Sequence, residues 1–195
     1  MSTPTVAALL GGNSLWAEGV RRLNPEFFPK SAEGQTPHTL WIGCSDSRAP
    51  ESLITFARPG DIFVHRNIGN QALRGDDNML AVLDFAVNVL EVKTVVICGH
   101  SKCGAVHGAF DAARTGRPPV PHLPADSPVN RWLRPLVGIA KGHEDADVNQ
   151  LIDLNIRAQV KNIQVILSEW KPEAGGVLVH GLIYDLASGD LRELH

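Results

Sequence analysis

The chain has 195 residues, of which 44% are hydrophobic and 20% are charged. These proportions are those of an ordinary folded domain, and they exclude a disordered, collagen-like or low-complexity chain. The formal net charge of -3 gives no general attraction to nucleic acid or to anionic lipid, so we expect small solutes as partners.

The length predicts one domain over residues 1–195, because a domain takes roughly 150 residues. No stretch approaches the 18 consecutive apolar residues of a membrane helix. The first basic residue is Arg21, so the N-terminus lacks the pattern of a secretory or mitochondrial signal. A cytoplasmic location is therefore expected.

Residues 1–34 are predicted to form an N-terminal helical arm. Within residues 13–28, a set of apolar side chains recurs at helical spacing. These residues are Leu15, Trp16, Val20 and Leu23. We expect this stripe to pack on a second subunit instead of the core of its own chain.

Short apolar, β-branched runs predict buried strands at residues 39–42, 62–65, 94–98 and 177–183. Helical patterns run from Asp76 to Leu90, behind an acidic capping cluster, and from Val148 to Trp170, ending before Pro172. Residues 116–128 hold five prolines and predict an extended surface connector. The alternation predicts an α/β fold with a mostly parallel central sheet flanked by helices, whose ligands bind beyond the carboxyl ends of the strands.

Two polar motifs follow the ends of predicted strands. Cys44, Asp46 and Arg48 follow the first strand, and His100 and Cys103 follow the third. The odd number of cysteines argues against a disulfide scaffold and favours metal binding or catalysis. Two thiolates and one imidazole, with a fourth position open, are typical of a catalytic zinc site.

Two residues could close that fourth position. Cys98 would make the zinc structural, but it lies inside a predicted strand, where a packed thiol is expected. Asp46 is expected to pair with Arg48 and to accept a hydrogen bond from zinc-bound hydroxide. The same carboxylate could instead bind zinc itself.

The pattern Cys44-x-Asp46-x-Arg48, followed by His100-x-x-Cys103, resembles that of the β-class carbonic anhydrases. Further stretches that carry the resemblance are residues 66–70, 155–162 and 181–190. The resemblance implies an α/β zinc enzyme that interconverts carbon dioxide and bicarbonate with release of a proton, by attack of zinc-bound hydroxide. It also implies a homodimer or a tetramer made of two dimers.

The resemblance assigns roles to particular residues. Cys44, His100 and Cys103 would be the zinc ligands, and Asp46 with Arg48 the catalytic dyad. The substrate pocket it implies consists of Gln35, Phe63, Phe85 and Gly104. Phe85 stands where the family would supply a tyrosine.

Trp41, Arg66 and Tyr184 match a second bicarbonate site that some members of the family use in an inactive, closed form. The alternative is that the two aromatic residues belong to the core and that Arg66 forms a structural ion pair.

Two other functions fit the same residues. The zinc site could hydrolyse carbon disulfide or carbonyl sulfide, or the zinc could be structural in a non-catalytic assembly module. A Cys₂His zinc site has no net charge and acidifies its water less than an all-histidine site, so we expect activity to rise at alkaline pH.

Overall fold

The computed structural model describes residues 5–170 and 176–194. They form two compact units, one up to Thr36 and the other from Pro37 onward. Residues 1–4 of the predicted arm, and Pro172 after the last predicted helix, lie outside the described residues. Among the described helices, none has both the length and the apolar character that crossing a bilayer requires.

The first unit consists of two helices, α1 (Val6–Leu23) and α2 (Phe27–Glu33). Thr5 caps α1 by accepting a hydrogen bond from the Ala8 amide at 3.3 Å. Neither helix contains a buried residue, although Trp16 and Phe28 make an edge-to-face contact with their ring centroids 5.5 Å apart. This unit therefore presents most of its apolar side chains outward.

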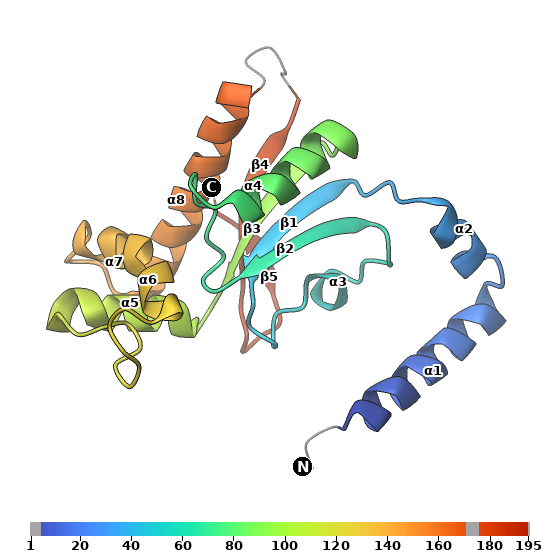
Figure 1. The fold of residues 1–195 in the computed structure, drawn as a ribbon, viewed down its shortest axis with the longest axis horizontal. Helices are drawn as coiled ribbons and strands as arrows, with labels where there is room; N and C mark the ends of the chain where they lie inside the picture. Colours follow the sequence, from blue (N-terminus) through green and yellow to red (C-terminus); the bar gives the residue numbers. More distant parts are fainter. Residues whose placement is uncertain (1–4, 171–175, 195) are drawn as a thin grey trace. The chain divides into compact units, whose positions relative to one another are not determined.

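The second unit is built on a five-stranded sheet in the order β2-β1-β3-β4-β5 (Figure 1). The strands are β1 (Thr39–Cys44), β2 (Ile62–Asn67), β3 (Thr94–His100), β4 (Leu178–Tyr184) and β5 (Leu191–Glu193). The first four are parallel, and β5 is antiparallel to β4. The predicted α/β class with a mostly parallel sheet is confirmed.

The first three strands extend two residues beyond their predicted ends, and β4 is shifted by one residue. Backbone pairing continues through the polar and glycine residues at the strand ends, because the ladder needs only N–H and C=O groups. The short strand β5 was not predicted, because its three residues carry no apolar alternation.

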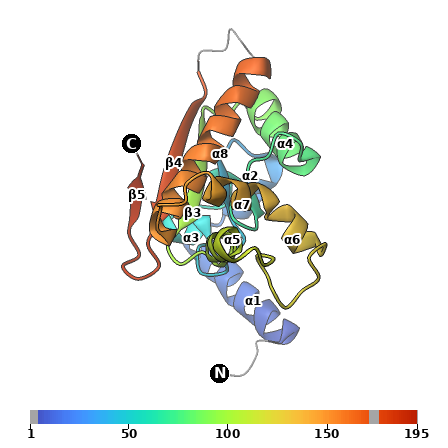
Figure 2. The same ribbon diagram turned by 90° about the vertical axis from the view of Figure 1, so that its left-hand side faces the viewer.

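Most helices cover one face of this sheet (Figure 2). All the helices of the second unit are α3 (Glu51–Ile54), α4 (Asp77–Asp84), the π-helix η1 (Phe85–Val89), α5 (Gly104–Thr115), α6 (Pro128–Trp132), α7 (Arg134–Lys141) and α8 (Val148–Trp170), as far as the structure describes the chain. The main core lies between the sheet and α4, α5, α7 and α8. A smaller cluster on other residues of the same strands contains Trp41, Val96 and Cys98.

The helix predicted from Asp76 to Leu90 is not a continuous α-helix. Asp76 caps α4 as expected, accepting from the Asn78 amide at 3.2 Å, but after Asp84 the chain widens into η1. The Leu90 amide donates to the Phe85 carbonyl at 3.0 Å, which is a five-residue spacing. An apolar pattern cannot distinguish this wider turn from an α-turn.

Helix α8 approaches the sheet closely at two glycines. A Cβ atom added at Gly99 would lie 2.8 Å from Ile156 Cδ1, and one added at Gly181 would lie 2.9 Å from Ile156 Cγ2. Because neither glycine has a side chain, these two positions on β3 and β4 leave room for Ile156, which is completely buried. This contact fixes the distance between α8 and the sheet.

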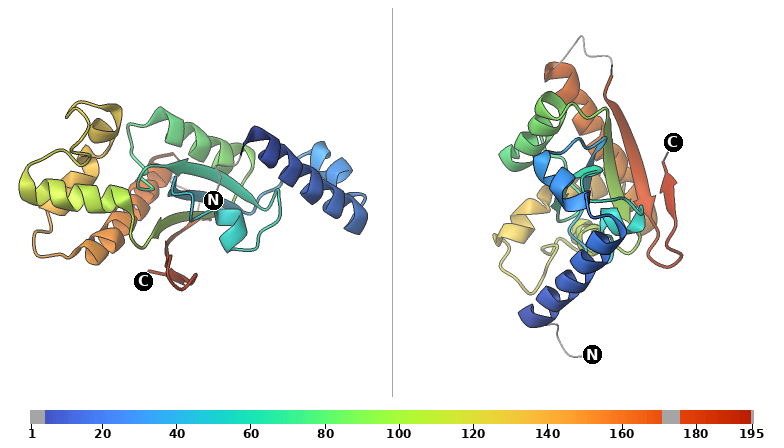
Figure 3. Two further views of the ribbon diagram at one scale, coloured as in Figure 1. Left: turned by 90° about the horizontal axis from the view of Figure 1, so that it is seen from below. Right: turned by 90° about the vertical axis from the view of Figure 1, so that its right-hand side faces the viewer.

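The proline-rich segment 116–128 is anchored to the helices beside it (Figure 3). The buried Asn130 side chain accepts from the Val120 amide at 2.8 Å and donates to the Val120 and Pro124 carbonyls. On α5, a Cβ atom added at Gly108 would lie 2.5 Å from the Pro119 carbonyl oxygen. The segment therefore packs directly against the α5 backbone.

Replacing Gly108 by alanine tests this packing. Because the added methyl group meets a backbone oxygen, Gly108→Ala should lower the free energy of unfolding by about 1–3 kcal/mol in urea denaturation. The control is Gly138→Ala on α7, where nothing lies within 4 Å of an added Cβ. The control should be neutral or stabilise by up to about 1 kcal/mol. Equal effects of the two substitutions would contradict the close approach.

Candidate metal centre

Two neighbouring strands place Cys44 and His100 at the same edge of the sheet. Cys44 is the last residue of β1, and His100 is the last residue of β3, which pairs with β1 in parallel. Lys102 has a left-handed conformation (φ 55°) in the turn that follows His100, and Cys103 then precedes α5. The turn brings Cys103 back beside the other two residues.

The three side chains form a compact, buried group of potential metal ligands. Their ligand atoms all lie within 4.8 Å of one another, and the sulfur atoms of Cys44 and Cys103 are 3.9 Å apart. The side chains of His100 and Cys103 are 1% exposed. No other such group of three or more occurs among the residues that the structure describes.

The hydrogen bonds of His100 leave one ring nitrogen ready for a metal. Its Nδ1 lies 2.9 Å from the Ser101 carbonyl oxygen, so Nδ1 carries the proton and donates it. Nε2 is then an acceptor, and it is buried without a hydrogen-bond partner. A buried nitrogen in this state is costly unless a cation binds it, so the residues present fit a divalent metal.

The electrostatics of the two thiols also suit a cation. The hydrogen bond from Cys103 lowers the pKa of the Cys44 thiol to about 4, against the opposing effect of burial. The same interaction raises the pKa of Cys103, since one thiolate now faces the other thiol. The pair therefore shares one proton, which a bound divalent cation would release.

Asp46 lies beside this group and is held by Arg48. Its Oδ1 accepts from the Arg48 amide and Nε, both at 2.9 Å, and its Oδ2 accepts from a terminal guanidinium nitrogen at 2.7 Å. These hydrogen bonds hold the pKa of the Asp46 carboxyl well below its ordinary range. Oδ2 lies 3.7 Å from His100 Nε2, so an ionised carboxylate faces the ligand group.

Arg66 holds the backbone of the loop that carries Cys44 and Asp46. It donates to the Cys44 carbonyl at 2.8 Å and to the Asp46 carbonyl at 2.5 Å, and it lies 3.9 Å from the Glu51 carboxylate. Trp41 and Tyr184 pack in the cluster around Cys98. In the pairing of β1 with β2, Arg66 lies opposite Gly43. The indole of Trp41 covers Gly43.

Three residues of the predicted substrate pocket lie in the second unit and one lies in the first. Phe63 on β2 and Phe85 at the start of η1 stack with their ring centroids 5.8 Å apart, and Phe85 is 44% exposed. Gly104 directly follows Cys103 as the first residue of α5. Gln35 is an exposed residue of the first unit.

A network of buried amides connects α8 to the loop after β2. Gln159 accepts from the Ala72 amide at 2.9 Å and donates to Asn155, and Asn155 donates to the Gly69 carbonyl at 3.0 Å. The Gly69 amide in turn helps to lower the pKa of Cys44 through a hydrogen bond. The network thus supports the loop that lies against one of the candidate ligands.

Neither Asn155 nor Gln159 was predicted to have a role of its own. A signal was present, because these two amides lie at helical spacing among the apolar residues Ile152, Ile156 and Ile163 of the same helix. A polar side chain inside a buried stripe has to find a partner, so it indicates a specific tertiary contact.

The fold and the site together define an α/β protein with a buried Cys₂His group at the carboxyl edge of its sheet. A family model described as carbonic anhydrase matches residues 39–191. The carbonic anhydrase of Emericella nidulans is 34% identical over 194 residues, covering 94% of this chain and 80% of the relative. That of Saccharomyces cerevisiae is 31% identical, covering 94% and 86%.

Solved structures agree with this result. One of the tetrameric β-carbonic anhydrases of Sordaria macrospora has a TM-score of 0.84 at 38% identity, covering 95% of this chain and 94% of that one. A β-carbonic anhydrase of Aspergillus fumigatus has a TM-score of 0.83 at 39% identity, covering 96% and 89%. The chain belongs to the β-class carbonic anhydrase family and is an enzyme of that class.

The amide network predicts a large effect of one buried substitution. Gln159→Leu leaves the Ala72 amide without its acceptor and the Asn155 Oδ1 without its donor, and each orphaned group should cost roughly 1–3 kcal/mol of unfolding free energy in urea titrations. Gln164→Leu is the control, since Gln164 is exposed on the same helix and should change stability by less than about 0.5 kcal/mol. Similar losses for the two variants would show that the network does not stabilise the fold.

Proposed function

We propose that this enzyme binds Zn²⁺ through Cys44, His100 and Cys103 and catalyses the reversible hydration of carbon dioxide to bicarbonate and a proton. One observation carries the proposal: His100, whose Nε2 is buried without a hydrogen-bond partner, offers a ligand atom within 4.8 Å of two cysteine sulfur atoms. The membership of the chain in the β-class family supports the reaction.

The donor set favours zinc over harder cations. Two sulfur ligands and one imidazole suit Zn²⁺, whereas Mg²⁺ and Ca²⁺ prefer oxygen. When bound, zinc supplies a Lewis acid that makes water a nucleophile near neutral pH. Three protein ligands leave one position for water and substrate.

Asp46 and Arg48 would orient the nucleophile. An ionised carboxylate can only accept hydrogen bonds, so Asp46 fixes the direction in which the reacting water points its proton. Arg48 keeps the carboxylate ionised and in place through three hydrogen bonds. Closure of the fourth metal position by Asp46 would require these bonds to break, so their presence supports the open arrangement.

The aromatic stack of Phe63 and Phe85 is proposed as an apolar wall for carbon dioxide, which carries no charge and has little affinity for polar groups. Gln35 and Gly104 complete the proposed pocket on the basis of the family resemblance. A hydroxyl contact to bicarbonate is not available from Phe85, in contrast to the tyrosine expected at this position.

The second bicarbonate site at Trp41, Arg66 and Tyr184 stays a prediction. The Arg66 guanidinium already donates to two carbonyls and faces Glu51, an arrangement that fits the structural alternative as well. Displacement of these partners would have to accompany the binding of bicarbonate there.

A homo-oligomer, either a dimer or a tetramer made of two dimers, is proposed for the assembly. The similar Sordaria macrospora enzymes are tetrameric, and neither helix of the first unit contains a buried residue. A cytoplasmic location stays a prediction from the sequence.

A purely structural zinc is disfavoured by the position of Cys98. Its thiol belongs to the smaller cluster with Trp41 and Val96, apart from the main core that contains Cys44 and Cys103. Burial raises the pKa of Cys98 to about 12, as expected for a packed thiol. Hydrolysis of carbon disulfide or carbonyl sulfide would use the same three metal ligands. Activity assays with these two substrates, beside carbon dioxide, separate hydrolysis from hydration.

Stopped-flow hydration of carbon dioxide by the zinc-loaded enzyme, from about pH 6.5 to 9, tests the proposal. The rate should rise toward high pH, because a metal-activated water loses its proton in this range. Asp46 is ionised throughout, since its pKa is held well below its ordinary range, so it should add no step to the profile. The absence of hydration at every pH, with zinc still bound, would refute the proposed reaction.

The ligand assignment is tested by comparing two cysteines. Cys103→Ser should lower zinc affinity at least about tenfold in chelator competition and abolish most of the activity, because a thiolate ligand is lost. Cys98→Ala is the matched control, as this cysteine is buried but lies outside the ligand group. It should keep full zinc occupancy. Loss of zinc from the control alone would refute the assignment.

The dyad is tested against a second arginine–aspartate pair. Asp46→Asn and Arg48→Gln should retain zinc but lower the hydration rate by roughly 10²-fold, because the nucleophile loses its orienting acceptor. Arg58→Gln disrupts the pair with Asp61, which is likewise an exposed loop contact. That control should keep wild-type rates, and an equal loss in all three variants would argue against a specific role for the dyad.

A further inference from the structure

A pocket of about 520 Å³ lies at the end of α5 that is remote from the metal group. Ala112 in its wall is eight residues from Gly104, or about 12 Å along the helix. The opposite wall is one face of α7, and the proline-rich segment closes a third side. The lining residues used below are Ala112, Arg117, Asn130, Arg134, Val137 and Lys141.

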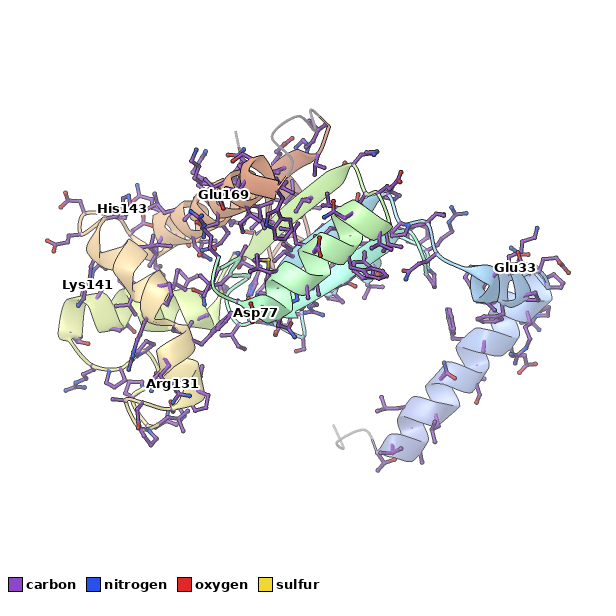
Figure 4. The ribbon with its side chains drawn as sticks, turned by 45° about the horizontal axis from the view of Figure 1, so that its top comes forward. Glu33, Asp77, Arg131, Lys141, His143 and Glu169 are labelled. Carbon is purple, nitrogen blue, oxygen red and sulfur yellow. The ribbon has the colours of Figure 1, made fainter. Side chains whose placement is uncertain are left out.

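The charge of this pocket is opposite to that of the whole chain. The chain has a net charge of -3, but Arg117, Arg134 and Lys141 line the pocket and no aspartate or glutamate does. Arg134 and Lys141 are two turns apart on α7, so both side chains leave the same face of the helix. Figure 4 labels Lys141 at the end of α7.

The two arginines of this pocket differ from the other arginines of the second unit. The guanidinium group of every other arginine there has a partner, either a side chain or a backbone carbonyl. The partnered arginines are Arg48, Arg58, Arg66, Arg74, Arg114, Arg131, Arg157 and Arg192. Within the described residues, Arg117 and Arg134 have no such contact, so their guanidinium groups are available to an external anion.

The walls of the pocket are held in place by buried contacts. Asn130 is 2% exposed and makes three hydrogen bonds to the proline-rich segment, and Gly108 allows Pro119 to pack on α5. Between the cations the lining is apolar, with Ala112 on α5 and Val137 on α7. The cavity is therefore preformed, with an apolar floor and a cationic rim.

We propose that this pocket is a binding site for a small phosphorylated molecule that has an apolar or aromatic part. Guanidinium groups match the paired oxygens of a phosphate, and the apolar floor suits the remainder of such a ligand. The volume lies within the roughly 300–1,000 Å³ of small-molecule sites. The proposal is independent of the reaction at the metal group.

Calorimetric titration of the zinc-loaded enzyme with AMP, inorganic phosphate and adenosine tests the site. AMP should bind saturably and more tightly than phosphate, while adenosine, which has no charge, should bind at least about tenfold more weakly than AMP. Adenosine binding as tightly as AMP, or no saturable binding of either anion at millimolar concentration, would overturn the proposal.

Variants of the pocket separate it from the metal group. Arg134→Gln with Lys141→Gln should weaken AMP binding at least about tenfold and leave the hydration rate unchanged. Lys93→Gln removes an exposed cation that does not line the pocket, so it should bind AMP as the wild type does. Unchanged AMP binding in the pocket variant, which would indicate binding at the metal group, refutes the proposal. Equal weakening by Lys93→Gln, which would indicate a general charge effect, also refutes it.

Discussion

The parallel pairing of β1 with β3 is the constraint on which the candidate ligand group of Cys44, His100 and Cys103 depends. β1 lies between β2 and β3. After the carboxyl end of β1 the chain first forms β2 on one side of β1 and later forms β3 on the other side. Such a reversal opens a crevice beyond the strand ends. Gly43 is paired with Cys98, so Cys44, one residue further along β1, and His100, two residues further along β3, reach the same edge of the sheet. A slip in this register would separate the two ligands.

Contacts from distant parts of the chain hold the loops at this edge. Arg66 binds the carbonyls of the loop after β1, and the amides of α8 bind the loop after β2. The indole of Trp132 also donates to this second loop, to the Ile68 carbonyl at 2.7 Å. Because Asn155 and Gln159 are buried in α8, the geometry of the ligand group depends on the stability of the α8 interface as well as on the loops themselves.

The four parallel strands and the long helix α8 were predictable because each has a continuous apolar run or stripe. The ligand group was predictable from chemistry that is specific to cysteine and histidine at strand ends. Other features depend on tertiary contacts that leave little local signal. The anchoring of residues 116–128 by Asn130 joins positions that are close in space and carry no apolar periodicity of their own. The support from Gln159 is indicated only by a polar side chain within the apolar stripe of α8, a signal that does not identify its partner.

The short π-helix η1 gives the stack of Phe63 and Phe85 an unusual origin. A π-turn accommodates one residue more than an α-turn, so its presence is equivalent to a single-residue insertion between α4 and β3. The insertion changes the direction in which successive side chains leave the helix axis. It lets Ala86 and Val87 remain in the core while Phe85 stays partly exposed against Phe63. The shape of the surface at the Phe63–Phe85 stack is thus tied to the length of this helix, and relatives with an uninterrupted α-helix here would present a different residue at this surface.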